Sequence, residues 1–189
     1  MKEDLRVQKT KAALFHAFYE LLSEKNYESI TVNELCERAT VRRATFYKHY
    51  NDKQDFLVGI VTRFRESFNQ MMGEKNQCPD IKDYFSKYLE LILGKIAAHP
   101  TVAQNILTSQ MRDPFINVVI QINFKETVSK LEEAVKNGAR LTVCPEVAAS
   151  AIVGGVSLLL VHWFENGMTT PRDVLVKDTR KVIEGIIES

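Results

Sequence analysis

The stretch "ITVNELCERATVRRATFYKHYNDKQDFL", residues 30–57, carries the strongest local structural signals in this chain. Thr31 followed by Glu34 forms the pattern of a capping box, in which each side chain bonds the free backbone N–H of the other residue. This pattern predicts a short helix from Thr31 to about residue 39. A second short helix fits residues 42–49, so the stretch is expected to fold as two short helices joined by a tight turn.

Nearly every other segment also has the 3.6-residue periodicity of a helix. Asn51 and Asp52 can cap the next helix, with Gln54 as the reciprocal partner of Asn51. Prolines stand at or just before most later helix starts, and Gly138 and Gly167 stand at helix ends. The expected helices cover residues 5–24, 31–39, 42–49, 52–73, 80–98, 101–110, 114–137, 145–166 and 172–188. We therefore expect an all-α fold with about nine helices and no strand.

Charge is distributed unevenly along the first 53 residues, although the formal net charge of the 189-residue chain is only +1. From Glu20 to Glu37 there are five glutamates and one lysine, and from Arg38 to Lys53 there are five basic residues and one aspartate. Such a contrast indicates either an ordinary solvated pair of helices or a basic surface that meets an anionic partner.

A short helix, a tight turn and a second short helix, packed on a preceding helix, are typical of a helix-turn-helix that binds DNA. The second helix would present Arg42, Arg43 and Thr45 to base edges, because an arginine fork matches two acceptors of guanine. Phe46 and Tyr50 would face inward and hold this helix to the core. The side chains predicted to contact bases or phosphates are Thr31, Arg42, Arg43, Thr45, Tyr47, Lys48, His49 and Lys53.

Residues 30–57 resemble the DNA-binding signature of the TetR/AcrR family of transcriptional regulators, and "AFYELLSEKNYESIT", residues 17–31, is similar to the family's first helix. The resemblance covers about the first 60 residues. The positions that carry it are Ile30, Thr31, Val32, Leu35, Ala39, Val41, Thr45, Phe46, Tyr47, His49, Tyr50, Lys53 and Leu57. The chain departs from the family pattern at Thr40, where glycine is usual, and at Arg42, where serine is frequent. We expect Thr40 either to strain the turn or to cap the second short helix.

This resemblance implies a DNA-binding domain at residues 1–51 and a helical regulatory and dimerisation domain at residues 52–189. It also implies a homodimer that binds a palindromic operator, with repression relieved by a small apolar effector. The dimer helices would be those at 145–166 and 172–188. A TetR-like coactivator or ligand sensor, acting through protein partners without its own operator, is the alternative.

The apolar segment "VAASAIVGGVSLLLVHWF", residues 147–164, supports the dimer from composition alone, because it contains no Asp, Glu, Lys or Arg. Its length just reaches that of a membrane span. No basic cluster flanks it, however, so we favour a helix buried in a core or between subunits, with no membrane. Ala151, Gly154 and Gly155 are small enough to permit close helix approach. The residues predicted to lie at a dimer interface are Ala151, Gly155, Leu158 and His162.

An effector pocket would be lined by aromatic and other apolar side chains that recur at helical spacing after residue 60. Plain core packing is the alternative for each of them. The candidates are Phe64, Phe68, Tyr88, Ile92, Met111, Phe115 and Trp163.

Several other classes of protein find no support in the sequence. There is no phosphate-binding glycine loop, no nucleophile elbow and no zinc-protease motif, so we expect neither an enzyme nor a cofactor. Cys36, Cys78 and Cys144 are widely spaced and odd in number, which indicates reduced thiols without metal-ligand spacing. The amino terminus lacks the apolar run of a signal peptide, so a cytoplasmic protein is expected.

Overall fold

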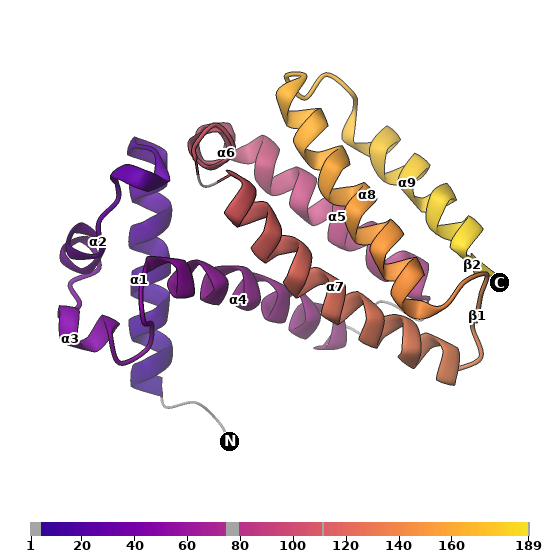
Figure 1. The fold of residues 1–189 in the computed structure, drawn as a ribbon, viewed down its shortest axis with the longest axis horizontal. Helices are drawn as coiled ribbons and strands as arrows, with labels where there is room; N and C mark the ends of the chain where they lie inside the picture. The colour runs from indigo at the N-terminus through magenta and orange to yellow at the C-terminus, as the bar shows by residue number, and fades with distance from the viewer. Residues whose placement is uncertain (1–4, 75–79, 111, 189) are drawn as a thin grey trace. The chain divides into compact units, whose positions relative to one another are not determined.

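The structure is a computed structural model that describes residues 5–74, 80–110 and 112–188 (Figure 1). The described residues form nine α-helices, and the all-α expectation is confirmed. The first part of the chain contains α1 (Leu5–Glu24), a 3-10 turn (Tyr27–Ser29), α2 (Val32–Arg38), α3 (Arg43–Phe46) and α4 (Lys53–Glu74). The remaining helices are α5 (Ile81–Ala98), α6 (Pro100–Leu107), α7 (Arg112–Lys136), α8 (Pro145–Glu165) and α9 (Arg172–Ile186).

The expectation that the chain has no strand is wrong, because two segments of two residues each pair as antiparallel strands. Arg140–Leu141 (β1) pairs with Ile187–Glu188 (β2), so the end of the chain returns to the connection between α7 and α8. Strands of two residues have too few positions to show an alternating pattern, which explains why the sequence did not indicate them.

The described residues divide into two compact units that are not continuous in sequence. The N-terminal unit combines Met1–Thr62 with His99–Phe115, and the second unit combines Arg63–Ala98 with Ile116–Ser189. The reason is that α6 packs on α1: the Asn105 amide donates to the carbonyl oxygen of Leu22 at 2.8 Å. The functional boundary expected between residues 51 and 52 stays a prediction.

Aromatic rings form the centre of the N-terminal unit. Phe56, at the start of α4, is fully buried, and its ring centroid lies 5.4 Å from that of Phe18, 5.7 Å from Phe46 and 5.0 Å from Tyr50. One ring of α4 thus holds α1 and α3 together. Gly59 lies so close to Tyr50 that a Cβ there would stand 2.8 Å from the ring, which makes the absence of a side chain necessary for this packing.

The second unit is built from α5, α7, α8, α9 and the later part of α4. In Figure 1, α8 and α9 run side by side, and α9 also packs along α5. Arg180 of α9 pairs with Asp83 of α5 and with Glu184 one turn further on, which raises the pKa of the Arg180 guanidinium. The apolar core of this unit includes Phe68, Tyr88, Leu131, Ile152 and Ile183.

Candidate functional site

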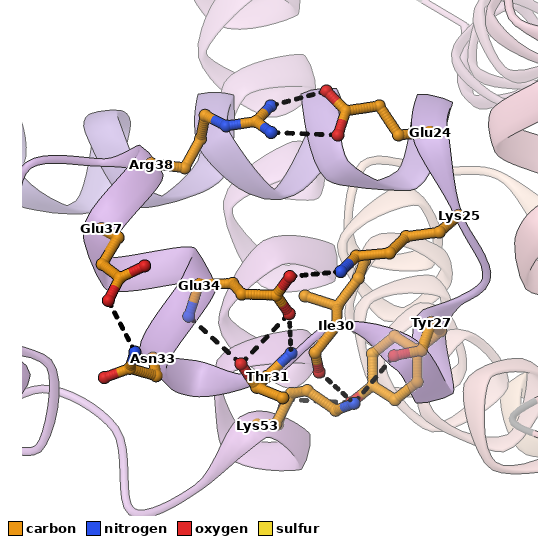
Figure 2. Close-up of polar contacts among 10 residues, drawn as sticks. All are labelled: Glu24, Lys25, Tyr27, Ile30, Thr31, Asn33, Glu34, Glu37, Arg38 and Lys53. Atoms are coloured by element: carbon orange, nitrogen blue, oxygen red, sulfur yellow. Dashed lines mark hydrogen bonds and ion pairs between the residues drawn. The ribbon is translucent and has the colours of Figure 1, made fainter.

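The start of α2 is held by the capping box that the sequence predicted (Figure 2). Thr31 Oγ1 accepts from the backbone N–H of Glu34 at 3.1 Å, and Glu34 Oε2 accepts from the backbone N–H of Thr31 at 3.1 Å. Lys25, just after α1, also donates to the Glu34 carboxylate. These bonds, first that from Lys25 and then that from Thr31, lower the pKa of Glu34 to about 2.

Glu34 is therefore expected to make stability depend on pH. Its folded pKa is about 2 against an ordinary value of 4.5, so its contribution is complete above about pH 4.5 and is lost as pH falls towards 2. The measurement is the free energy of unfolding of the wild type and of Glu34→Gln from pH 7 to pH 2. The two curves should be separated at neutral pH and converge in acid, and a constant separation would contradict this assignment.

The other glutamates of the acidic segment are also engaged by neighbours. Arg38, at the end of α2, donates to both carboxylate oxygens of Glu24, at 2.7 and 2.9 Å, and lies 3.8 Å from Glu20 (Figure 2). The bond from Arg38 lowers the pKa of Glu24, and that with Glu24 raises the pKa of Arg38. Glu37 accepts from the Asn33 amide at 2.7 Å. Glu24 and Glu34 therefore help to fasten α2 to α1, whereas the bond between Glu37 and Asn33 lies within α2.

Lys53 was predicted to contact a phosphate, but in the structure its ammonium group bonds to backbone carbonyl oxygens. Its ammonium group donates to the carbonyl oxygens of Tyr27 at 2.8 Å and Ile30 at 2.7 Å, and it lies 4.1 Å from the centroid of the Tyr27 ring (Figure 2). Partial burial lowers the pKa of Lys53, and burial raises the pKa of Tyr27 to about 12. Lys53 thus joins the start of α4 to the segment before α2, and its contact with a phosphate stays a prediction.

The cap of α4 differs in one detail from the expected arrangement. Asp52 Oδ1 accepts from the backbone N–H of Asp55 at 2.7 Å, and Asp55 Oδ2 accepts from the backbone N–H of Asn51 at 2.9 Å. The reciprocal residue is therefore Asp55, and the prediction of Gln54 is wrong. The reason is that Asp52 provides the capping side chain, which moves the third helical position to Asp55.

The turn between α2 and α3 keeps a left-handed residue although no glycine is present. Thr40 has φ 54°, its backbone N–H donates to Glu37, and the N–H of Val41 donates to Cys36. This is the Schellman pattern of helix ends, with threonine at the position that glycine normally takes. The alternative that Thr40 caps α3 is wrong, because the residue before that helix is Arg42, without a side-chain cap.

Replacing Thr40 with glycine is expected to stabilise the protein by about 1 kcal/mol, because a left-handed conformation strains a residue with a Cβ. The measurement is equilibrium unfolding in urea. The matched control is Ala39→Gly at the preceding position, where φ is −77°. There glycine relieves no strain and should destabilise by about 0.5–1 kcal/mol. A loss of stability in Thr40→Gly would overturn this account of the turn.

The second short helix is shorter than the expected 42–49: only Arg43–Phe46 is regular α-helix, and residues 47–49 continue as turns. Phe46 and Tyr50 are buried, as predicted. Arg42, Arg43, Tyr47 and Lys48 are exposed, whereas Thr45 and His49 are half-buried. Within the described part of the chain, the charged groups of Arg42, Arg43 and Lys48 form no ion pair or hydrogen bond. Three cations next to paired glutamates therefore remain open to an anionic partner.

The second unit contains a cavity of about 50 Å³ between five helices. Tyr88 and Ile92 line it, as the sequence analysis proposed for an effector pocket. Phe64, Phe68 and Trp163 instead pack in the surrounding apolar core, where the Trp163 indole N–H donates to the carbonyl of Thr170.

Two further pocket candidates lie elsewhere. Phe115 packs against the core of the N-terminal unit, and Met111 lies outside the described residues. The cavity is also lined by three buried polar residues that were not predicted from the sequence, Arg65, Asn123 and Thr127. The helical spacing could have indicated that Arg65 is buried. It lies on the same helix face as three buried apolar residues, Val61, Phe68 and Met72.

The predicted interface residues of α8 are all exposed on the chain by itself. Ala151, Gly155, Leu158 and His162 follow one another at helical spacing, and Leu158 is 71% exposed. By length and composition, α8 is also the one helix in the described residues that could cross a membrane, and its most apolar window is 33% buried. Much of this apolar helix thus lacks a partner within the chain.

The remaining candidate chemistry is limited. In residues 5–74, 80–110 and 112–188, no group of three or more His, Cys, Asp or Glu side chains could hold a metal ion. Cys36 is buried and Cys144 is exposed, both as free thiols, and Cys78 lies outside the described residues.

Comparison with known proteins places the strongest similarity at the helix-turn-helix and the helix before it. Residues 14–60 match the family model described as "Bacterial regulatory proteins, tetR family". An uncharacterised HTH-type transcriptional regulator of Bacillus subtilis, YxbF, is 41% identical over 61 residues, which are 32% of this chain and 16% of that protein. The chain spans about half the length of the next curated relatives that it matches.

Solved structures resemble the chain over most of its length. Their sequence identity is low, so this likeness concerns the fold alone. Lin0861 from Listeria innocua has a TM-score of 0.69 and 23% identity, covering 96% of this chain and 93% of that one. The transcriptional regulator FadR from Bacillus subtilis, in complex with stearoyl-CoA, has a TM-score of 0.65 and 18% identity, covering 93% and 98%. These solved structures thus resemble the chain in the fold of both units.

Proposed function

We propose that this chain, a member of the TetR family of transcriptional regulators, represses transcription by binding a palindromic operator as a homodimer. The observation that carries the proposal is the open cationic group formed by Arg42, Arg43 and Lys48, at the turn and helix that would enter the major groove. The nearby glutamates, which would repel a phosphate backbone, are engaged with Lys25, Asn33 and Arg38.

In this proposal, residues 1–51 bind DNA, and residues 52–189 dimerise and bind an effector. Arg43 and Thr45 read base edges, while Tyr47, Lys48 and His49 contact flanking phosphates and set the register. Two copies of the chain would meet through α8 and α9, and their DNA-contacting helices would match half-sites separated by about 34–36 Å or a multiple of it. The exposed stripe of α8 supports this pairing.

The effector is a small molecule with an apolar body that enters the cavity of the second unit. The apolar lining supports this role. A structural neighbour, FadR from Bacillus subtilis, was solved in complex with stearoyl-CoA, a ligand with an apolar chain. The effector releases DNA only if it binds more tightly to the dimer whose DNA-contacting helices are wrongly spaced, since equal affinity would shift nothing. The protein acts in the cytoplasm without catalysing a reaction.

Replacing Arg43 with alanine is expected to weaken binding to the cognate operator by about 1–3 kcal/mol, or roughly 5- to 150-fold. The loss follows from removal of a two-pronged contact to a guanine. The measurement is a titration of fluorescent duplexes from the promoter region beside the gene, at two salt concentrations. Binding to unrelated duplexes should change much less.

Lys48→Ala is the comparison variant. It should weaken all duplexes to a similar degree and lower the slope of log affinity against log salt by about one. If the wild type binds no promoter-region duplex, the proposed function is rejected, and isolation of a protein partner in the absence of DNA would then favour the coactivator or sensor alternative.

A further inference from the structure

The cavity of the second unit contains a buried cation that has no anionic partner within the described residues. Arg65, on α4, is 3% exposed and lines the cavity. Within the described residues its Nη1 donates to Asn123 Oδ1 at 2.9 Å, whereas Nε and Nη2 have no hydrogen-bond partner. A charged group that is removed from water with two of its three nitrogens lacking an acceptor destabilises the protein, so this arrangement requires an explanation other than packing.

The surroundings hold the Arg65 guanidinium in one orientation. Its central carbon lies 4.0 Å from the centroid of the Tyr88 ring and 5.4 Å from that of Tyr84. The Asn123 side chain is oriented in turn, because its Nδ2 donates to the carbonyl oxygen of Val119 at 2.8 Å. Asn123 therefore presents its oxygen to Arg65, and stacking covers a face of the guanidinium. The edge that carries Nε and Nη2 is left without a partner.

The free edge has the geometry that a carboxylate matches. The N–H groups of Nε and Nη2 are parallel and lie on the same side of the guanidinium, so they can donate to the two oxygens of one carboxylate. The rest of the cavity is mainly apolar, with Leu89, Ile152 and Val156 among its lining residues. The cavity volume of about 50 Å³ favours a compact molecule.

We propose that the effector is a compact apolar carboxylate, whose two oxygens accept from Nε and Nη2 of Arg65 while its hydrocarbon part fills the cavity. This inference rests on the proposed role of the cavity as the effector site, and it adds the charge and the chemical class of the ligand. Thr127, one helical turn after Asn123 and also lining the cavity, is 2% exposed and provides a hydroxyl on the same face of α7.

The experiment compares acids with their neutral isosteres on the full-length protein by isothermal titration calorimetry. The pairs are hexanoate with hexanamide and benzoate with benzamide, which differ mainly in charge. At least one acid should bind wild-type protein about tenfold or more tightly than its amide. Equal binding within each pair, or no binding of either acid, would overturn the proposal, and this comparison does not depend on any variant.

Three variants at two positions on α4 locate the effect. Arg65→Met should remove the preference for the acid, whereas Arg63→Met, at an exposed position, should retain it. Arg65→Lys, which keeps the charge but loses the paired donors, should retain only part of the preference. A preference that persists in a folded Arg65→Met protein would overturn the assignment of the carboxylate to this residue.

Operator binding without ligand is measured separately, so that the two proposals can fail independently. If the protein binds its operator but does not distinguish acid from amide, only the inference about the effector fails. If the acid binds through Arg65 and no operator is bound, the cavity assignment stands and the proposed regulatory function fails.

Discussion

Replacing Phe46 with alanine is expected to destabilise the N-terminal unit by about 3–5 kcal/mol. Phe46 is fully buried, and its ring lies 5.5 Å from that of Tyr50 and 5.7 Å from that of Phe56. The regular part of α3 spans only Arg43–Phe46, so this side chain is the main apolar anchor of the helix. The measurement is equilibrium unfolding in urea, followed by circular dichroism, together with operator binding, which should be lost.

Tyr47→Ala is the matched control, because it removes the neighbouring ring, which is 48% exposed. Its free energy of unfolding should stay within about 0.5 kcal/mol of the wild type. Since Tyr47 is proposed to contact a phosphate, DNA affinity should still fall in this variant. A loss of less than about 1 kcal/mol in Phe46→Ala would show that α3 does not depend on this anchor.

Replacing Leu158 with aspartate is expected to dissociate the proposed dimer. The side chain is 71% exposed on the single chain, and burial of a leucine contributes about 1.5–3 kcal/mol. A two-fold symmetric interface contains the residue twice, so the loss is about 3–6 kcal/mol before any repulsion between the two carboxylates. Sedimentation equilibrium should show a monomer, and affinity for a two-half-site operator should fall by more than about 100-fold.

Val135→Asp is the control for this effect, because Val135 is an exposed apolar residue of α7, 44% exposed, outside the α8 stripe. This variant should keep the oligomeric state and the operator affinity of the wild type. If Leu158→Asp has the same oligomeric state as the wild type, α8 does not form the interface, and the proposed arrangement of the dimer fails.

The features that could be predicted from the sequence depend on residues a few positions apart. The capping box of Thr31 and Glu34, the prolines that open α6 and α8, and the left-handed glycines at 138 and 167 all appear in the structure. Each acts within one turn of backbone, so a single sequence contains all the information required. For this reason the all-α fold and the position of the helix-turn-helix were predictable.

The environments of single charged side chains were not predictable in this way. Lys53 and Arg65 are both basic residues on α4, yet Lys53 is bonded to two carbonyls near α2 and Arg65 is stacked on Tyr88 beside a cavity. Neither contact depends on local spacing, because the partners lie 23 or more residues away in the chain. The same holds for α6, which the fold brings onto α1.

The sequence alone determined which segments of this protein form helices and which short helix carries its arginines, because these depend on local backbone bonds and periodic apolar positions. Only the tertiary structure decided which cations remain free to bind. Arg38 and Arg43 are five positions apart, but Arg38 reaches Glu24 of α1, whereas Arg43 forms no ion pair within the described residues. The physical reason is that a charge is neutralised by whatever the fold brings within a few ångströms of it, and that distance is unrelated to separation along the chain.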